Sequence, residues 1–376
     1  FFGSAATWFP FFNPYLLSLG LSGAQIGLLG SVRPLVVLVS QPLWGMAADA
    51  HGRRKLLILA ALCTSLVLPG YYFGRTLGFI LLWTAIVTTV NNPIGSMLDS
   101  VSLDQVERHK RFSYGAVRLW GAAGWAIASV VAGRLLAGRD PRMMFVFAAT
   151  GFFGMFLLAT RIPREPEVQR AQGRAWAGVG LVLRQRSVVV LLVMITAMQI
   201  GTSPIFAFYS IYLGELGASQ GLIGLAFSIQ GLSEVPVFLA SSAIIRRIGV
   251  ERAIILGMCA YAIRVLAYSV IRAPELAAAI EATHGVTFSL MFVAAVHYVN
   301  AHTPAEWRAT GQSLLSAAYF GVGAIVGSVV GGMLFDRVGV RMLYRIDGLY
   351  ILAIAAVALF VLRPARRSVA TTAVPQ

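Results

Sequence analysis

A few charged or imidazole side chains lie within long apolar stretches of the sequence. A charge is energetically costly in such surroundings, so these residues indicate where chemistry could take place. A charge at the centre of a bilayer costs about 3 kcal/mol or more on insertion scales, so each such residue is a candidate for function. Carboxyl and imidazole groups bind and release protons, and an arginine offers a planar fork of donors to carboxylates or hydroxyl groups. These residues are Arg33, Asp99, Arg118, Glu234, Arg264, Glu281 and His284.

Four of these residues form a predicted proton-handling group. Glu281 and His284 are three positions apart and share one face of a helix. Arg264 lies in the preceding apolar stretch and is the expected counter-charge, whereas Glu234 has little polar company and is the best remaining proton carrier. The alternative is a structural role, with Glu234 bonded to Arg264.

A second group is predicted to bind a solute. Asp99 and Arg118 occupy neighbouring apolar stretches at similar depth, because a helix rises about 1.5 Å per residue, so we expect them to pair. A purely structural ion pair is the alternative. Arg33 has no evident partner in the sequence and is included among the solute-binding candidates.

The elements that position these side chains are membrane-spanning helices. The chain is 58% hydrophobic and 12% charged, with a mean hydropathy of +0.77, far more apolar than a soluble domain. Stretches of about 20 apolar residues span a bilayer, and the sequence predicts twelve of them, from 1–20 to 342–362. The expected fold class is therefore an all-α membrane protein.

The net charge of +15 is explained by membrane topology. If odd-numbered helices run outward, 19 of the 30 basic residues fall in cytoplasmic loops and 8 in the opposite loops. Basic loops face the cytoplasm, so both termini are expected there, in a multi-pass protein of the inner or plasma membrane. Contact with anionic lipid accounts for the basic residues, and nucleic-acid binding is not expected.

Several chemistries are not expected from the sequence. It contains no CxxC, HExxH or GxSxG motif and no glycine-rich phosphate loop, so we predict no cofactor, no metal and no enzyme activity. The two cysteines, Cys63 and Cys259, are read as packing residues. The sequence opens inside an apolar segment without an initiator Met, and a short leader is expected to be missing.

The chain repeats itself. A shift of 197 positions aligns residues 11–35 with 208–232, and 11 of the 25 positions are identical, among them Gly27/Gly224; a shift of 199 aligns 124–143 with 323–342, with Ser129/Ser328 identical. Two parallel repeats of six helices, related by a pseudo-two-fold axis, can rock around a central cavity, the geometry of alternating-access transport. The predicted parts are an N-terminal bundle (1–160), a cytoplasmic linker (161–186), a C-terminal bundle (187–363) and a cytoplasmic tail (364–376).

A motif between the second and third stretches resembles the loop motif of the major facilitator superfamily. Its residues are Gly45, Asp49, Gly52, Arg53 and Arg54, although Ala50 stands at a position that is usually basic. The resemblance implies a gating role, with Asp49 pairing with arginines to hold one conformation.

Further motifs resemble the oligosaccharide:proton symporters, the lactose permease family, and its phenylpropionate-permease-like and MFSD-type relatives. They are the run from Phe112 to Trp125, Arg33-Pro34, Pro42 to Gly45 and His284 to Phe288. The resemblance implies that Arg118 and Trp125 contact the solute and that Arg264 takes part in proton coupling. Glu281 and Thr287 depart from the family pattern, which has a lysine and a proton-carrying glutamate there.

The expectation is a proton-coupled symporter, acting as a monomer on an aromatic acid, a sugar or a nucleoside. A proton-driven exporter is the alternative within transport, since the same charges serve antiport. A non-transporting membrane receptor on the same scaffold is the alternative from another class.

Overall fold

The computed structural model describes residues 1–108, 114–162 and 177–362, without the side chains of residues 49, 103–108, 114–118, 177, 305 and 309. Over these residues it contains helices and no strand. The helices of the first half are α1 (Phe2–Ala6), α2 (Phe9–Ser18), α3 (Gly23–His51), α4 (Arg53–Val67), η1 (Leu68–Tyr72), α5 (Leu77–Arg108), α6 (Tyr114–Leu136) and α7 (Met143–Thr160). Those of the second half are α8 (Ala177–Leu183), α9 (Arg186–Glu215), α10 (Gln220–Ile248), α11 (Val250–Val270), α12 (Pro274–Ile280), η2 (Glu281–Thr283), η3 (Gly285–Leu290), α13 (Met291–His302), η4 (Ala305–Trp307), α14 (Arg308–Ala317), η5 (Ala318–Val322) and α15 (Gly323–Val361).

Ten stretches within the described residues are long and apolar enough to cross a membrane. The first predicted span is divided between the short helices α1 and α2, and the last two predicted spans lie in one stretch, Thr310–Val361. Gly339 interrupts that stretch with φ 72° and ψ 168°, a backbone conformation open to glycine and outside the helical region. The count of twelve stays a prediction for these reasons.

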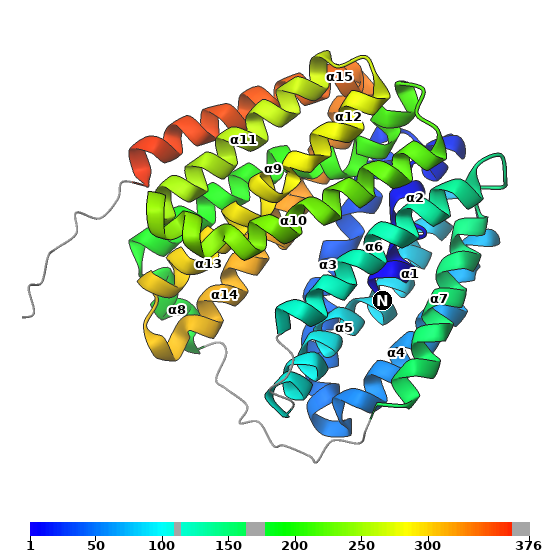
Figure 1. Cartoon of the computed structure of the whole chain (residues 1–376), viewed down its shortest axis with the longest axis horizontal. Coiled ribbons are helices and arrows are strands. Elements are labelled where there is room, and N and C mark those ends of the chain that lie inside the picture. The colour runs from blue at the N-terminus through cyan, green and yellow to red at the C-terminus, as the bar shows by residue number, and fades with distance from the viewer. Residues whose placement is uncertain (109–113, 163–176, 363–376) are drawn as a thin grey trace, which may run out of the picture.

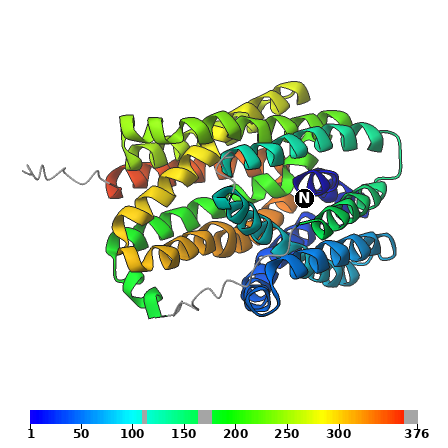
Figure 2. The ribbon, with the colours of Figure 1, turned by 60° about the horizontal axis from the view of Figure 1, so that its bottom comes forward.

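The helices gather in two sets. Helices α1–α7 lie on one side of the molecule and α9–α15 on the other (Figure 1). The two sets meet along two lines, where α3 packs against α15 and α6 packs against α10, and α6 runs beside α10 in Figure 1 and in the turned view of Figure 2.

Helices α3 and α10 begin and end at positions that the sequence repeat pairs. Each is 29 residues long, and the first and last residues of α10 lie 197 positions after those of α3. A serine starts both: Ser22 accepts from the backbone N–H of Gln25 and Ser219 from that of Leu222, which satisfies a donor that the first helical turn leaves free. The sequence repeat therefore extends to the local structure.

Close backbone packing joins the two sets at one end of the molecule, here named the seam end. It lies where residues 19–22, 137–142 and 216–219 connect helices. A Cβ atom on Gly27 of α3 would overlap the carbonyl oxygen of Ser328, and one on Gly224 of α10 would overlap that of Ser129. Small residues permit such crossings in membranes, and these two use residues that the repeat pairs.

Candidate functional site

Four predicted residues meet inside the second set of helices and are named here the acid–base cluster: Glu234 of α10, Arg264 of α11, Glu281 of η2 and His284. Arg264 Nη1 lies 3.5 Å from Glu281 Oε2 and 2.9 Å from His284 Nδ1. His284 Nε2 lies 3.4 Å from Glu234 Oε1. Arg264, Glu281 and His284 are at most 3% exposed, so these charges are paired away from solvent.

The local helix geometry brings the cluster together. After α12 the chain forms the 3-10 turn η2 and the π-helix η3 before α13 resumes. A side chain on Gly285 would overlap Ser233 of α10, and the Gly285 N–H donates to Ser233 Oγ at 3.0 Å. This close approach places His284 beside α10, and π-helical turns of this kind are frequent at functional sites.

The donors around His284 define its protonation state in this conformation. A guanidinium has donors and no acceptor, so the contact with Arg264 Nη1 requires an unprotonated Nδ1. The ring proton is then on Nε2, which lies 3.4 Å from Glu234 Oε1. His284 is therefore neutral in this conformation.

Tyrosine side chains complete the surroundings of the cluster. The Tyr268 hydroxyl donates to Glu281 Oε1 at 2.6 Å, and this residue is fully buried. The Arg264 guanidinium lies 4.9 Å from the Tyr261 ring centroid and 5.9 Å from that of Tyr268. Aromatic faces attract a cation, so they help to stabilise the buried arginine.

Arg33 contacts aromatic rings. Its guanidinium carbon lies 5.3 Å from the Phe9 ring centroid and 5.8 Å from that of Trp8, and it forms no ion pair or hydrogen bond with any described residue. The Phe9 ring is 6.0 Å from that of Trp125, whose Nε1 donates to the carbonyl of Phe227 in the other set of helices at 3.1 Å. Arg33 and Trp125 thus belong to one aromatic group.

The predicted pair of Asp99 and Arg118 is only partly described. Asp99 lies on α5, is partly buried and has an interaction partner. Arg118 lies on α6, and its side chain is outside the described residues. Their pairing stays a prediction.

The predicted gating motif joins α3 to α4. Gly52 ends α3 with φ 85°. Arg54 donates from Nε to the carbonyl of Ile162 and from Nη2 to that of Thr160, both at 2.5 Å, and so satisfies acceptors at the end of α7. Gly45 has open space beside its Cα, Arg53 has an interaction partner, and the side chain of Asp49 is outside the described residues.

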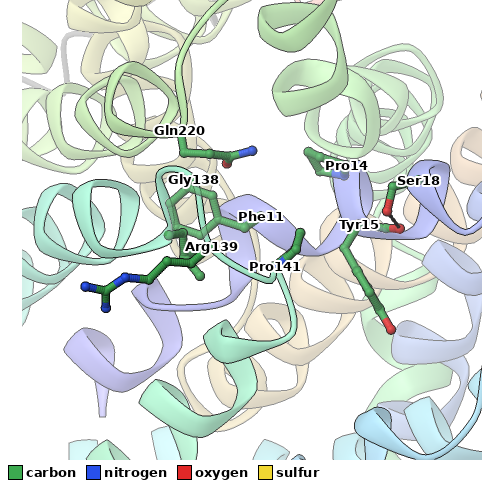
Figure 3. A pocket seen from close by; sticks show the side chains of 9 residues that line it. Phe11, Pro14, Tyr15, Ser18, Gly138, Arg139, Pro141 and Gln220 are labelled. Carbon is green, nitrogen blue, oxygen red and sulfur yellow. Dashed lines mark hydrogen bonds between the residues drawn. The ribbon is translucent and has the colours of Figure 1, made fainter.

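A pocket of about 190 Å³ opens at the seam end and contains none of the cluster residues in its lining. Figure 3 shows Gln220 of α10 pointing toward Pro14, while the Arg139 guanidinium points away from the other labelled side chains. Most of the lining is apolar, from residues such as Phe11 and Pro141. The pocket lies over the crossing of α6 and α10 and brings no acid and base together.

Three features of the site were not predicted. Tyr268 could not be singled out from the sequence, because a tyrosine in an apolar stretch is common. Asp347 of α15 is 5% exposed and could have been found, since a lone acid in an apolar stretch is the signal that pointed to Glu234. Gly27 and Gly224 stood out as repeated residues, but their packing partners were unknown.

Comparison with known proteins identifies the family. Residues 1–346 match the MFS_1 like family. The chain belongs to this family of the major facilitator superfamily. It is a multi-pass membrane transporter and not an enzyme.

The major facilitator protein has relatives along nearly its whole length. The maltose permease of Geobacillus stearothermophilus is 32% identical over 343 residues, which cover 89% of this chain and 85% of that protein. The probable 3-phenylpropionic acid transporter of Escherichia coli (strain K12) is 23% identical, and the alignment covers 97% of this chain and 94% of that protein. A crystal structure of the nucleoside transporter NupG aligns with a TM-score of 0.85 at 15% identity, covering 97% of this chain and 96% of that one, which shows the fold.

Proposed function

We propose that the protein is a proton-coupled symporter of a small organic solute that works by alternating access. The acid–base cluster carries this proposal. One buried cation, Arg264, contacts both Glu281 and His284, and Glu234 lies on the other side of the imidazole ring. A proton can be added to His284 Nδ1 only if Arg264 moves away, which links protonation to a change of conformation.

The proposed architecture has twelve spans in two six-helix bundles related by a pseudo-two-fold axis, with residues 1–160, 161–186, 187–363 and 364–376 as its parts. The paired limits of α3 and α10 and the paired crossings support it. With both termini in the cytoplasm, the seam end faces outward. The conformation described is then closed to the outside. A plasma-membrane location and a monomer complete the proposal.

The proposed solute site consists of Arg33, Asp99, Arg118 and Trp125. Arg33 supports a solute that carries a carboxylate, because its donors have no acidic partner among the described residues and the neighbouring rings can stack on an aromatic group. The 3-phenylpropionic acid transporter is a relative with such a solute in its name. A sugar is the second candidate, since the maltose permease is 32% identical.

Uptake into proteoliposomes tests the coupling. With an imposed inward proton gradient, we expect the solute to accumulate and the accumulation to vanish when a protonophore collapses the gradient. Glu234→Gln should abolish accumulation and retain exchange of solute across the membrane. Accumulation that ignores the gradient would overturn the proton coupling, and efflux driven by the same gradient would favour the exporter.

Competition tests the solute class. Aromatic carboxylates, the matching neutral amides and maltose are compared as inhibitors of uptake. A carboxylate that inhibits at least tenfold better than its amide, a difference removed in Arg33→Gln, supports the anion. Maltose as the only inhibitor would identify the sugar. Arg118→Lys should weaken either solute, because lysine cannot reproduce the bidentate fork.

A further inference from the structure

Asp347 is a buried acid outside the acid–base cluster. It lies on α15 beyond Gly339, within the apolar stretch Thr310–Val361, and is 5% exposed. Its Oδ2 atom has no hydrogen-bond partner among the described residues, and no ion pair there includes it. Neither the cluster nor the aromatic group uses this side chain.

Helices enclose this part of α15. A Cβ on Gly348 would contact Leu266 of α11, and one on Gly201 of α9 would contact Tyr350 and Ile351. Asp347 therefore lies on a segment of α15 that packs against both α9 and α11, and its side chain is buried there.

Tyrosines connect the surroundings of Asp347 to the cluster. Tyr344, one turn earlier on α15, is fully buried and its hydroxyl has no hydrogen-bond partner among the described residues. Its ring centroid lies 5.9 Å from that of Tyr268, which donates to Glu281, and 5.3 Å from that of Tyr212. Tyr350 follows Asp347 on the same helix.

The charges that face this region are mostly negative. The titratable groups near Tyr344 and Asp347 include Glu281 from η2 and Glu215 from α9. The cation from α11, Arg264, already contacts Glu281 and His284. On α15 itself Arg341 and Arg345 are exposed, and neither forms an ion pair with Asp347. An ionised Asp347 would be desolvated without a counter-charge.

We propose that Asp347 is a proton-binding site, separate from the acid–base cluster and occupied in this conformation. The chemistry is the addition of one proton to a carboxylate, with no other bond made or broken. Gly339 separates Asp347 from the first part of α15 with a non-helical backbone, so the segment that follows it can shift in the other conformation and expose the acid. The role of this proton in the transport cycle rests on the proposed function, whereas the presence of a proton on Asp347 does not.

Infrared difference spectroscopy of the purified protein in lipid tests the occupancy. At neutral pH, the spectrum of the wild type minus that of Asp347→Asn should contain the carbonyl band of a protonated carboxyl group, which shifts in D₂O. Asp336→Asn is the matched control on the same helix: Asp336 is exposed and accepts two backbone hydrogen bonds, so its difference should show carboxylate bands. Carboxylate bands for Asp347 as well would overturn the proposal.

Counting transported protons tests the release. The proton-to-solute ratio, measured from the gradient at which net flux reverses, should fall by one in Asp347→Asn and be retained in Asp347→Glu, which keeps the carboxyl group. A ratio that is unchanged in Asp347→Asn would overturn the role in transport. A wild type that moves no protons with its solute would instead overturn the proposed symport, while the infrared result still decides whether Asp347 holds a proton.

Discussion

Arg264 donates a hydrogen bond to Nδ1 of His284 at 2.9 Å, and the same Nη1 atom lies 3.5 Å from Glu281. One cation is thus shared between an acid and a neutral base. A proton added to Nδ1 of His284 would place two positive charges in contact, which is unfavourable in a buried site. His284 can be protonated there only when Arg264 moves away.

Removing the cation of this pair should destabilise the protein. Arg264→Gln leaves Glu281 buried and without its counter-charge, a change that costs about 3–5 kcal/mol in buried ion pairs. The thermal unfolding midpoint in detergent is expected to fall. In the double variant Arg264→Gln/Glu281→Gln part of the loss should return, because neither charge remains. Losses that simply add would mean that the two side chains are not coupled.

Tyr268→Phe tests the hydrogen bond to Glu281. The substitution keeps the buried ring and removes only the hydroxyl that lies 2.6 Å from Oε1. A hydrogen bond to a charged group contributes about 1.5–3 kcal/mol, so the unfolding midpoint should fall and uptake should weaken. Tyr261→Phe is the control, since its hydroxyl has no hydrogen-bond partner among the described residues. Equal effects of the two substitutions would argue against a role for the bond.

Gly27→Val and Gly224→Val should each open the seam end. A side chain at either position overlaps a serine carbonyl of the facing helix, and the backbone cannot yield without separating the two sets of helices. The variants should favour the opposite conformation and slow transport. Gly154→Val is the control, because a Cβ there meets open space.

The opening can be measured as a distance. Spin labels on cysteines at Arg139 and Gly214, both exposed, report on the two sides of the seam end after Cys63 and Cys259 are replaced by serine. The distance distribution should shift to longer values in both valine variants and stay unchanged in Gly154→Val. Unchanged distributions in all three would mean that the crossings tolerate a larger residue.

The loop between α6 and α7 should depend on pH. Hydrogen bonds from Arg142 hold the pKa of Asp140 below its ordinary value. Since the folded state lowers this pKa, the stabilisation is present above the unfolded value of about 4 and is lost as the pH falls through the folded value. Hydrogen-exchange protection of residues 137–142, corrected for intrinsic rates, should decrease in that range. Asp140→Asn should lack the pH dependence.

Much of the helical framework was predictable, because hydropathy and repeated residues are local signals. The stretch from Gly27 to Leu35 and its repeat pointed to related helices, and α3 and α10 have matching limits. The predicted last span, 342–362, begins just after Gly339, where the backbone of α15 leaves the helical conformation.

The candidate site was predictable where burial itself is the signal. Glu234, Arg264, Glu281 and His284 were expected together, and the structure places them in contact. Tyr268 was not, because its contact depends on how α11 crosses η2. The π-helix η3, which sets the depth of His284, has no distinctive sequence pattern.

The two crossings at the seam end differ in one respect. On the α3–α15 side the carboxylate of Asp336 accepts hydrogen bonds from the N–H groups of Gly23, at 2.6 Å, and Ala24, at 2.8 Å, where the helix dipole favours a negative charge. The residue at the corresponding position near the α6–α10 crossing is Ala137, which has no such group. The two sets of helices should therefore separate first at the α6–α10 crossing and last at the α3–α15 crossing. The outward opening is then asymmetric.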